Sequence, residues 1–254
     1  MIAGISFCQN EGVLNKKLEE CTEYGSPPFD GTIFIDSNIV TPNDPTTFIS
    51  LKYNGQETRK MYDRRVSDWI TNEPYLFPAI FTDTLSIEIQ VNSEFGSIQK
   101  AQKQAEKYAA VIGRLTTELR KDVETVWIHK GLKPFGGGNN NLLIHTDWSL
   151  KYYEKQGILE ETLIHEASHT SLDNYHAEHP DWLAAQINDC NYISDYARDN
   201  SKREDIAESY LPYFALRYRS DRISKNLKEK IENSIPNRII YFDNNSFNMF
   251  PIDH

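Results

Sequence analysis

"LIHEASHTSLDNYH" spans residues 163–176 and contains His165, Glu166 and His169 in the order H-E-x-x-H. On an α-helix, residues four positions apart lie on one face, so His165 and His169 can direct their imidazoles at a single ion. Glu166 is rotated by about 100° from His165, close enough to hydrogen-bond a metal-bound water without being a ligand itself. The pattern therefore predicts a zinc site on a helix, with Glu166 as general base.

Two histidines leave a zinc site incomplete, and the residues that follow them offer several candidates. The pattern H-E-x-x-H-x-x-G-x-x-H would need glycine at Leu172 and histidine at Tyr175, and both positions differ. His176 is one residue out of register, so we expect it, like His179, on the surface. Asp173 lies a full turn beyond the second histidine, and its short side chain favours a buried hydrogen-bond partner or a helix-end residue over a ligand.

Two carboxylates farther along the chain are better placed. Glu204 and Glu208 are four residues apart and so share one face of a second helix, from which either could reach the ion. Glu204 also has a structural alternative, because Ser201-x-x-Glu204 matches a capping box, in which the carboxylate turns back to the backbone. The spacing favours Glu204 as the ligand and leaves the capping role open.

Hydrophobic periodicity around the motif predicts strands and helices in one fold. Residues 85–92 alternate apolar and polar and predict a strand, while apolar residues at helical spacing over 97–123 predict a long amphipathic helix capped by Ser97. Two short strands follow at 124–130 and 140–147. The loop between them is rich in glycine and asparagine, which tolerate positive φ.

The remaining segments extend this α+β pattern. Periodicity and turn residues predict, in chain order, strands and loops over 22–56, a helix over 59–70, a motif helix that begins after Gly157, a short helix after Pro180, helical structure over 201–223 interrupted near Pro212, and a strand over 235–243. No break resembling a linker occurs between residues 85 and 220. We therefore expect a catalytic-type domain over residues 85–254, with an N-terminal extension over residues 1–84 packed on it.

Composition excludes some partners. A formal net charge of -10 argues against non-specific binding to nucleic acid or to an anionic membrane, since both need a basic face. No apolar run approaches the roughly 18 residues of a membrane span. We expect neither nucleic acid nor membrane as a partner.

The cysteines and the chain start bear on the cellular compartment. Cys8, Cys21 and Cys190 are too few for a disulfide scaffold, but Cys8 and Cys21 could close a small N-terminal loop in an oxidising compartment, which leaves one thiol unpaired. The start "MIAGISFCQN" lacks the basic segment of a signal peptide. The sequon at 244–246 favours secretion over a cytoplasmic location.

"HEASHTSLD" with a downstream "EDIAE" resembles the gluzincin group of zinc metallopeptidases, especially the catalytic domains of lethal-factor-like and Pro-Pro endopeptidases. The resemblance covers roughly residues 85–220, and its specific part is the two motifs. It implies a zincin-like fold with a small mixed sheet, a long backing helix, an active-site helix and a C-terminal helical part. It also implies hydrolysis of a peptide or protein substrate, by an endopeptidase rather than an exopeptidase, with one Zn²⁺ per chain.

The same resemblance implies roles for individual residues. Glu204, the first carboxylate of E-x-x-x-E, would be the third zinc ligand, and Glu208 would orient a ligand histidine. Tyr196 would donate a hydrogen bond to the tetrahedral intermediate. Its spacing of eight residues to Glu204 is one more than in the family, so Tyr192 or Tyr210 could serve instead.

Zincins bind an extended substrate along the edge strand of their sheet. Leu142, Leu143 and Ile144, directly before the motif helix, are the residues that we expect in this strand. The preceding "FGGGNNN" predicts a flexible hairpin loop, or alternatively a loop that closes over substrate. We expect His129 and His145 to be structural residues of their strands.

Two other functions remain open at this level. The first is a zinc-binding interaction or toxin-associated module without turnover, against which the intact Glu166 argues. The second is a hydrolase of a non-peptide amide, because the zinc chemistry is the same for both kinds of amide.

Overall fold

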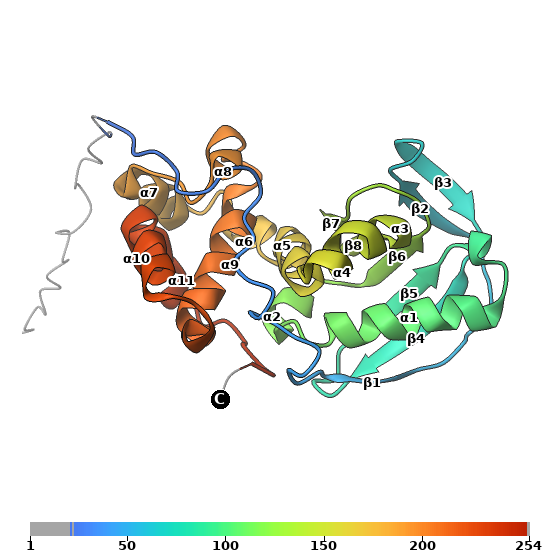
Figure 1. Cartoon of the computed structure of the whole chain (residues 1–254). Helices are drawn as coiled ribbons and strands as arrows, with labels where there is room; N and C mark the ends of the chain where they lie inside the picture. The colour runs from blue at the N-terminus through green and yellow to red at the C-terminus, as the bar shows by residue number, and fades with distance from the viewer. Residues whose placement is uncertain (1–20, 22, 253–254) are drawn as a thin grey trace, which may run out of the picture.

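The computed structural model describes residues 21 and 23–252, which form an α+β fold with a six-stranded mixed sheet (Figure 1). The strand order is β1-β4-β5-β6-β8-β7; the β5, β6 and β8 strands run parallel, and the other neighbours pair antiparallel. The strands of this sheet are β1 (Phe48–Leu51), β4 (Tyr75–Phe81), β5 (Ser86–Val91), β6 (Thr125–His129), β7 (Gly136–Gly138) and β8 (Asn141–His145). The predicted α+β class is confirmed.

Two apolar rows run across the three parallel strands and line one side of the core. The rows are Ile89, Val126 and Leu142, and Val91, Ile128 and Ile144, all fully buried. Helix α1 (Ile98–Ile112) packs on β1, β4 and β5, and helix α5 (Leu159–Ser171) packs on β7 and β8. The strands predicted over 85–92, 124–130 and 140–147 and the helix predicted after Gly157 are confirmed.

The long helix predicted over 97–123 is divided in two. Helix α1 begins after Ser97, whose hydroxyl accepts the predicted capping bond from the Lys100 amide at 3.3 Å, and it ends at Ile112, with Gly113 as its cap residue. A Cβ at Gly113 would lie 2.8 Å from the backbone nitrogen of Phe48, so glycine lets the end of α1 approach β1. The chain then turns into α2 (Thr117–Arg120), which packs on α5.

The helix predicted over 59–70 is wrong, because this segment forms a β-hairpin of β2 (Arg59–Asp63) and β3 (Asp68–Asn72). Its burial alternates: Met61 and Asp63 are buried, and the residues beside them are more exposed. This period of two belongs to a strand that packs one face on the rest of the protein.

The hairpin covers the face of the sheet opposite α1 and α5. Trp69 of β3 packs edge-on against Trp127 of β6, with ring centroids 5.3 Å apart. Trp127 alternates along its strand with the core residues Val126 and Ile128, so it points to the opposite face. The hairpin therefore lies against β6, and Figure 1 shows it at the upper right, away from α5.

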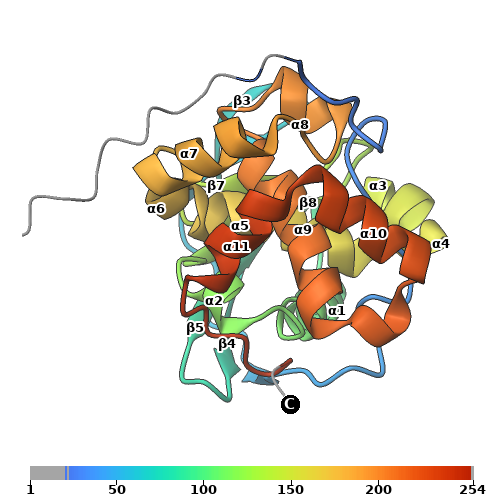
Figure 2. The same cartoon turned by 90° about the vertical axis from the view of Figure 1, so that its left-hand side faces the viewer.

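Most of the chain after residue 145 is helical, and Figure 2 views this part from its own side. The helices are α3 (Thr146–Trp148), η2 (Ser149–Tyr153), α4 (Glu154–Gln156), α5, α6 (Asp173–His176), α7 (Pro180–Asp189), α8 (Asp195–Asp199), α9 (Asp205–Tyr218), η3 (Ser220–Arg222), α10 (Lys225–Ser234) and α11 (Pro236–Asp243), with η1 (Ser93–Phe95) earlier in the chain. The helix predicted after Pro180 is confirmed. None of the described helices is long and apolar enough to cross a membrane.

Two predictions for the C-terminal part are wrong. Helix α9 continues through Pro212, because its residues 205–216 are all buried and this packing outweighs the one backbone hydrogen bond that proline cannot donate. The segment 235–243, predicted as a strand, contains helix α11 (Pro236–Asp243) and its cap residue Ile235. The segment's buried apolar positions Ile235, Ile239 and Phe242 are four and three residues apart, which is the helical period.

The N-terminal segment 23–47 crosses the front of the molecule from the helical part to the sheet (Figure 1). Its start is held by a disulfide between Cys21 and Cys190 and by a hydrogen bond from the Gly25 amide to the Cys190 carbonyl at 2.8 Å. The pairing suggested for Cys8 with Cys21 is therefore wrong. Cys8 itself lies outside the described residues.

Strands β1 and β4 also come from the first 84 residues and belong to the main sheet. The boundary predicted between residues 84 and 85 falls between β4 and β5, which pair along six residue positions. The sheet next to the candidate site is thus built from both predicted regions.

Candidate metal centre

Three side chains converge between the sheet and the helical part. Helix α5 presents His165 and His169 one turn apart, and Glu204 immediately precedes α9, which packs on α5. The His169 Nε2 lies 3.2 Å from the His165 Nε2 and 3.1 Å from the Glu204 Oε2, and the His165 Nε2 lies 3.4 Å from the same oxygen. The three side chains expose only 10%, 8% and 4% of their surface.

These separations fit a metal ion. Zinc–ligand bonds of about 2.0–2.1 Å at tetrahedral angles place ligand atoms roughly 3.3 Å apart. All three measured distances lie close to this value. We call His165, His169 and Glu204 the triad; it can hold one metal ion.

Each triad histidine has a carboxylate behind it. The His169 Nδ1 lies 2.8 Å from Asp173 Oδ2, and the His165 Nδ1 lies 3.4 Å from Glu208 Oε1. A carboxylate hydrogen-bonded to Nδ1, as Asp173 is to His169, holds the proton there, which leaves the Nε2 lone pair free to face an ion and makes the imidazole a better ligand. The Glu208 Oε1 faces the His165 Nδ1 at the longer distance without a hydrogen bond. Asp173 and Glu208 are the carboxylates that the sequence suggested behind the site.

Glu208 is fixed by the N-terminal segment. Its Oε2 accepts hydrogen bonds from the Ser194 hydroxyl at 2.6 Å and from the Ile33 amide at 3.0 Å, and its side chain is fully buried. Segment 23–47 therefore supports the triad through Glu208, a role with no signal in its turn-rich sequence.

The capping-box alternative for Glu204 is wrong. Helix α9 begins at Asp205, so Glu204 is its cap position, and its side chain makes no capping hydrogen bond. Its Oε1 instead lies 3.3 Å from Arg203 Nε, while Oε2 faces the two histidines.

His169 and Glu204 form an ion pair when no metal is bound. Burial lowers the pKa of His169, but hydrogen bonds to Asp173 and Glu204 outweigh burial and raise it to about 10. Burial raises the pKa of Glu204, and its bonds to the two histidines outweigh burial and hold the pKa well below its usual value. A metal needs a neutral imidazole, so its binding must displace a proton from His169.

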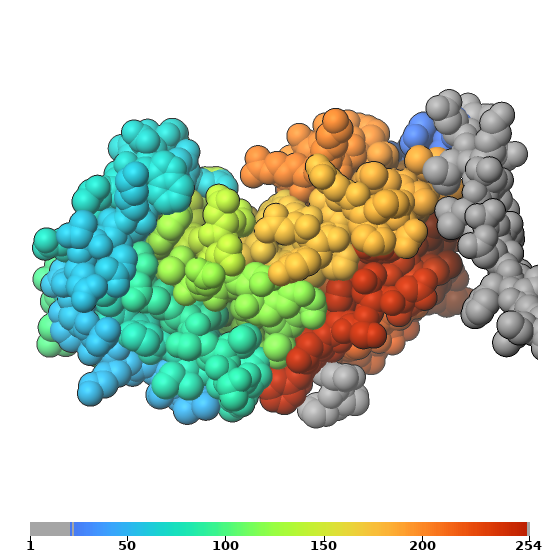
Figure 3. Space-filling view, turned by 180° about the vertical axis from the view of Figure 1, so that it is seen from behind, coloured from blue at the N-terminus to red at the C-terminus, as the bar shows by residue number. Residues whose placement is uncertain are grey.

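A cavity of about 390 Å³ opens onto the triad and also holds Glu166 and Tyr196. Figure 3 shows the surface hollowed between the hairpin, in cyan, and the segment around α8, in orange. Burial and the neighbouring Glu204 carboxylate raise the pKa of Tyr196, so its phenol stays protonated and can donate a hydrogen bond. We call this space the metal cavity.

The two alternative tyrosines do not line the metal cavity. Tyr192 stacks on the guanidinium of Arg238 at 4.7 Å. Tyr210 is fully buried, and its hydroxyl contacts the sulfur of Met249 at 3.6 Å. Of the three tyrosines considered, Tyr196 alone lies beside the triad.

The edge strand differs from the prediction. Leu142, Leu143 and Ile144 belong to β8, which pairs with β6 on one side and β7 on the other, and their side chains are buried. The edge is β7, formed by the glycines of "FGGGNNN", and the positive φ values of Asn139 and Asn140 turn the chain from β7 into β8. The glycines of the predicted flexible loop thus form a paired strand. Sequence patterns do not predict this strand, because glycine has no side chain and so shows no alternation of apolar and polar residues.

Glycine is required in β7 by its contact with α5. A Cβ at Gly137 would clash with the backbone carbonyl of Glu166, and the next amide, of Gly138, donates a hydrogen bond to the Thr170 hydroxyl at 2.9 Å. The edge strand therefore lies directly against the helix that carries the triad histidines.

Gly137→Ala should lower the free energy of unfolding by about 1–3 kcal/mol, because neither backbone can move away without breaking β7 from β8. Gly136→Ala is the matched control, since its Cβ would meet the end of the flexible Arg64 side chain. Denaturant titration of both variants measures the difference. Equal stability of the two would contradict the close packing of β7 on α5.

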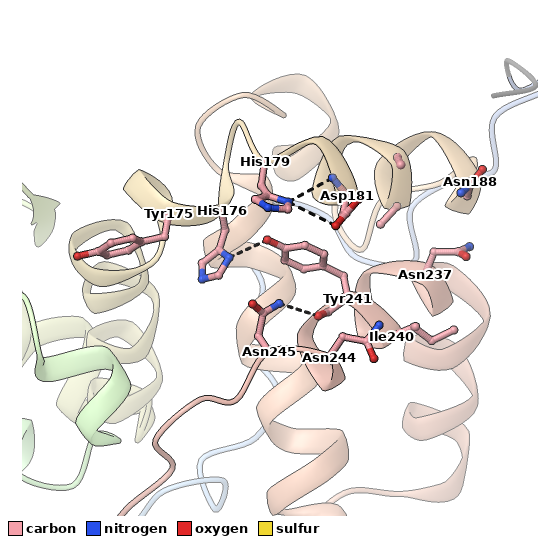
Figure 4. Close-up of a pocket in the computed structure, with 12 residues that line it drawn as sticks. Tyr175, His176, His179, Asp181, Asn188, Asn237, Ile240, Tyr241, Asn244 and Asn245 are labelled. Atoms are coloured by element: carbon pink, nitrogen blue, oxygen red, sulfur yellow. Dashed lines mark hydrogen bonds and ion pairs between the residues drawn. The ribbon is translucent and has the colours of Figure 1, made fainter. Parts of the chain in front are cut away.

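A second cavity, of about 500 Å³, shares no lining residue with the metal cavity (Figure 4). His176 is buried there, with its Nδ1 2.7 Å from the Tyr241 hydroxyl, so the expectation of a surface position is wrong. His179 is exposed, as predicted. Neither residue joins the triad.

His129 and His145 are buried at the ends of β6 and β8 with their rings stacked at 5.4 Å. The His129 Nδ1 pairs with the Asn92 amide and the His145 Nδ1 with the Lys130 carbonyl, each at 2.9 Å. Burial lowers the pKa of His129 to about 4, so this ring is neutral. Both residues lie in strands of the sheet and outside the triad.

No protein-family model matches this chain, and the searches of curated proteins and of solved structures found no similar protein. The geometry of the triad and of the metal cavity is therefore the basis for a functional proposal.

Proposed function

We propose that this protein is a zinc metallopeptidase, and that His165, His169 and Glu204 hold its zinc ion. The observation that carries the proposal is the convergence of these three ligand atoms in a cavity that also holds Glu166. Two imidazoles and one carboxylate form a donor set typical of catalytic zinc, and three protein ligands leave a coordination position for water or substrate. The gluzincin-like motifs support the same assignment.

Zinc bound at the triad would lower the pKa of a coordinated water and polarise the substrate carbonyl. Glu166 is the general base: it removes the proton of the attacking water and delivers it to the leaving amine. Tyr196 donates a hydrogen bond to the oxyanion that develops on the substrate. Asp173 and Glu208 keep the two histidines in the required orientation.

We place the substrate along β7, in the extended conformation that pairs a peptide with a sheet edge. Strand β7 is the end of the sheet nearest to the triad, and it contacts α5 at Glu166. Beside it, a groove of about 270 Å³ is walled by Tyr62, Trp69 and Trp127. An endopeptidase would use both β7 and this groove to hold residues near the scissile bond.

The disulfide indicates that the protein functions outside the cytoplasm. Cys21 and Cys190 are paired, and disulfides persist mainly in oxidising compartments. We infer that the protein is secreted or otherwise exposed to such a compartment.

The purified protein should contain about one zinc per chain, measured by elemental analysis. His169→Ala and Glu204→Gln each remove one ligand and should lose most of this zinc. His179→Ala is the matched control, because it removes an exposed histidine outside the metal cavity. A wild type without stoichiometric zinc, or triad variants that keep it, would rule out the proposed ligand set.

Cleavage of a diverse peptide library, with and without chelator, tests the reaction. We expect cleavage that stops when the metal is removed and returns with added zinc. A zinc-loaded protein that cuts no peptide would favour the binding module, or a hydrolase of non-peptide amides if such a compound is cut instead.

A further inference from the structure

Basic side chains gather at the mouth of the metal cavity, although the whole chain has a formal net charge of -10. An adjoining cavity of about 460 Å³ is lined by Tyr62, Arg64, Ser67, Lys133, Pro134 and Arg203. Three of these residues are basic and none is acidic; we call Arg64, Lys133 and Arg203 the basic rim. Arg64 and Arg203 also line the metal cavity, so a ligand of the triad meets this rim.

Arg64 differs from the neighbouring arginines of its hairpin. Arg59 pairs with Glu88 at 3.1 Å, and Arg65 pairs with Asp63 at 2.7 Å. Within the part of the chain that the structure describes, no hydrogen bond or ion pair engages the half-buried Arg64. Arg64 lines open cavities, so an arriving anion can pair with its guanidinium without displacing an acidic side chain of the protein.

Arg64 lies next to β7, the strand along which we place the substrate. Its Nη2 lies 2.7 Å from the point that a Cβ of Gly136 would occupy, so the guanidinium rests on the edge strand β7. Arg64 also lines the aromatic groove beside β7. A peptide paired with β7 would therefore carry a side chain or its terminus past Arg64.

The other two members of the basic rim differ in whether an acidic side chain pairs with them. Lys133 is exposed, and no described acidic residue pairs with it. Arg203 pairs with the Glu204 Oε1 at 3.3 Å, but its side chain is 75% exposed. Arg64 and Lys133 thus carry the charges that remain for a ligand.

We propose that the substrate carries a carboxylate close to the scissile bond and that Arg64, assisted by Lys133, binds it. This inference rests on the proposed function for its reference to a scissile bond, whereas the carboxylate site itself does not need turnover. A guanidinium matches a carboxylate with two parallel hydrogen bonds, which a lysine cannot make. The carboxylate belongs either to an Asp or Glu side chain or to the C-terminus of a peptide.

The test measures binding in a Glu166→Gln background, so that peptides stay intact. The probes are short peptide pools, degenerate except for one central residue, which is Asp or Glu in one set and Asn or Gln in the other. Each set is made with a free and with an amidated C-terminus, which separates the two sources of the carboxylate. Affinity is measured by calorimetry at low and at high salt.

We expect one of the two carboxylate sources to bind about tenfold or more tightly than its amide counterpart, as for a charge-assisted hydrogen bond. Arg64→Gln should abolish this preference, Lys133→Gln should reduce it, and high salt should weaken it. Lys60→Gln is the matched control, because it removes an exposed charge from the same hairpin, and Lys60 lines neither the metal cavity, nor the groove beside β7, nor the cavity of the basic rim.

Equal binding of carboxylate and amide pools, or a preference that survives Arg64→Gln, would overturn the carboxylate site. Absence of cleavage by the wild type, with the carboxylate preference intact, would instead remove the peptidase function and leave the site standing. Cleavage without any preference for a carboxylate would support the peptidase function and overturn the carboxylate site.

Discussion

Glu166→Gln should abolish most hydrolysis while the protein keeps its zinc. Glu166 lines the metal cavity beside the triad, and in the described part of the chain no hydrogen bond or ion pair engages its carboxylate. Glutamine has nearly the same shape but cannot accept a proton from water. Since a general base contributes typically 10²–10⁴-fold to a rate, kcat should fall by about that factor.

The measurement combines elemental analysis with steady-state kinetics on a peptide found by library screening. Glu178→Gln is the matched control, because Glu178 is exposed and does not line the metal cavity. Retention of zinc together with lost turnover separates the base from a ligand. Full activity in Glu166→Gln would show that another group takes the proton, and loss of zinc would show that Glu166 supports the metal.

The sequence was sufficient for the parts of the site that depend on one helix. His165, Glu166 and His169 are separated by a single turn, so their relative directions follow from the helical period alone. Asp173 is four residues beyond His169 and lies 2.8 Å from it, although α5 ends at Ser171 and Asp173 is the first residue of α6.

Glu204 was harder to predict from the sequence, because it is 35 residues from His169. Helical spacing limits the choice to Glu204 or Glu208, but only the packing of α9 on α5 turns one toward the Nε2 atoms and the other toward a Nδ1 atom. The resemblance of the motifs implied which of the two glutamates would face the ion and which would lie behind a histidine, a choice that spacing alone left open.

Long-range pairing explains most of the failures. Strand β7 consists of three glycines, and its place at the edge depends on pairing with β8 and on contact with α5. The hairpin at 59–72 contains charged residues whose partners, such as Glu88, lie elsewhere in the chain. Arg64 was missed because its place beside β7 depends on the hairpin, where the sequence pattern predicted a helix, whereas Arg203 could have been noticed because it directly precedes Glu204.

Replacement of Arg238 by methionine should cause the largest loss of stability among the variants considered. The side chains of Arg238 and of its two partners are fully buried, and its guanidinium lies 2.8 Å from both Asp189 and Asp205. Arg238→Met would leave two buried carboxylates without their cation. Loss of one partner from such a network costs about 3–5 kcal/mol.

Arg238→Met should also affect metal binding at the candidate metal centre. Asp205 is the first residue of α9 and directly follows Glu204, so the buried ion pairs fix the start of the helix that positions this ligand. We therefore expect weaker zinc binding in Arg238→Met, although no triad residue is altered. Denaturant unfolding, followed by tryptophan fluorescence, and zinc titration measure the two effects.

The matched control is the triple variant Arg238→Met with Asp189→Asn and Asp205→Asn, which removes the buried charges together. Its loss of stability should be clearly smaller than that of Arg238→Met, because the large cost comes from unpaired carboxylates rather than from the missing guanidinium. A triple variant as unstable as the single one would instead assign the cost to packing around Arg238. In that case the cation–π contact with Tyr192 and the contact with Trp182 would be the interactions to examine next.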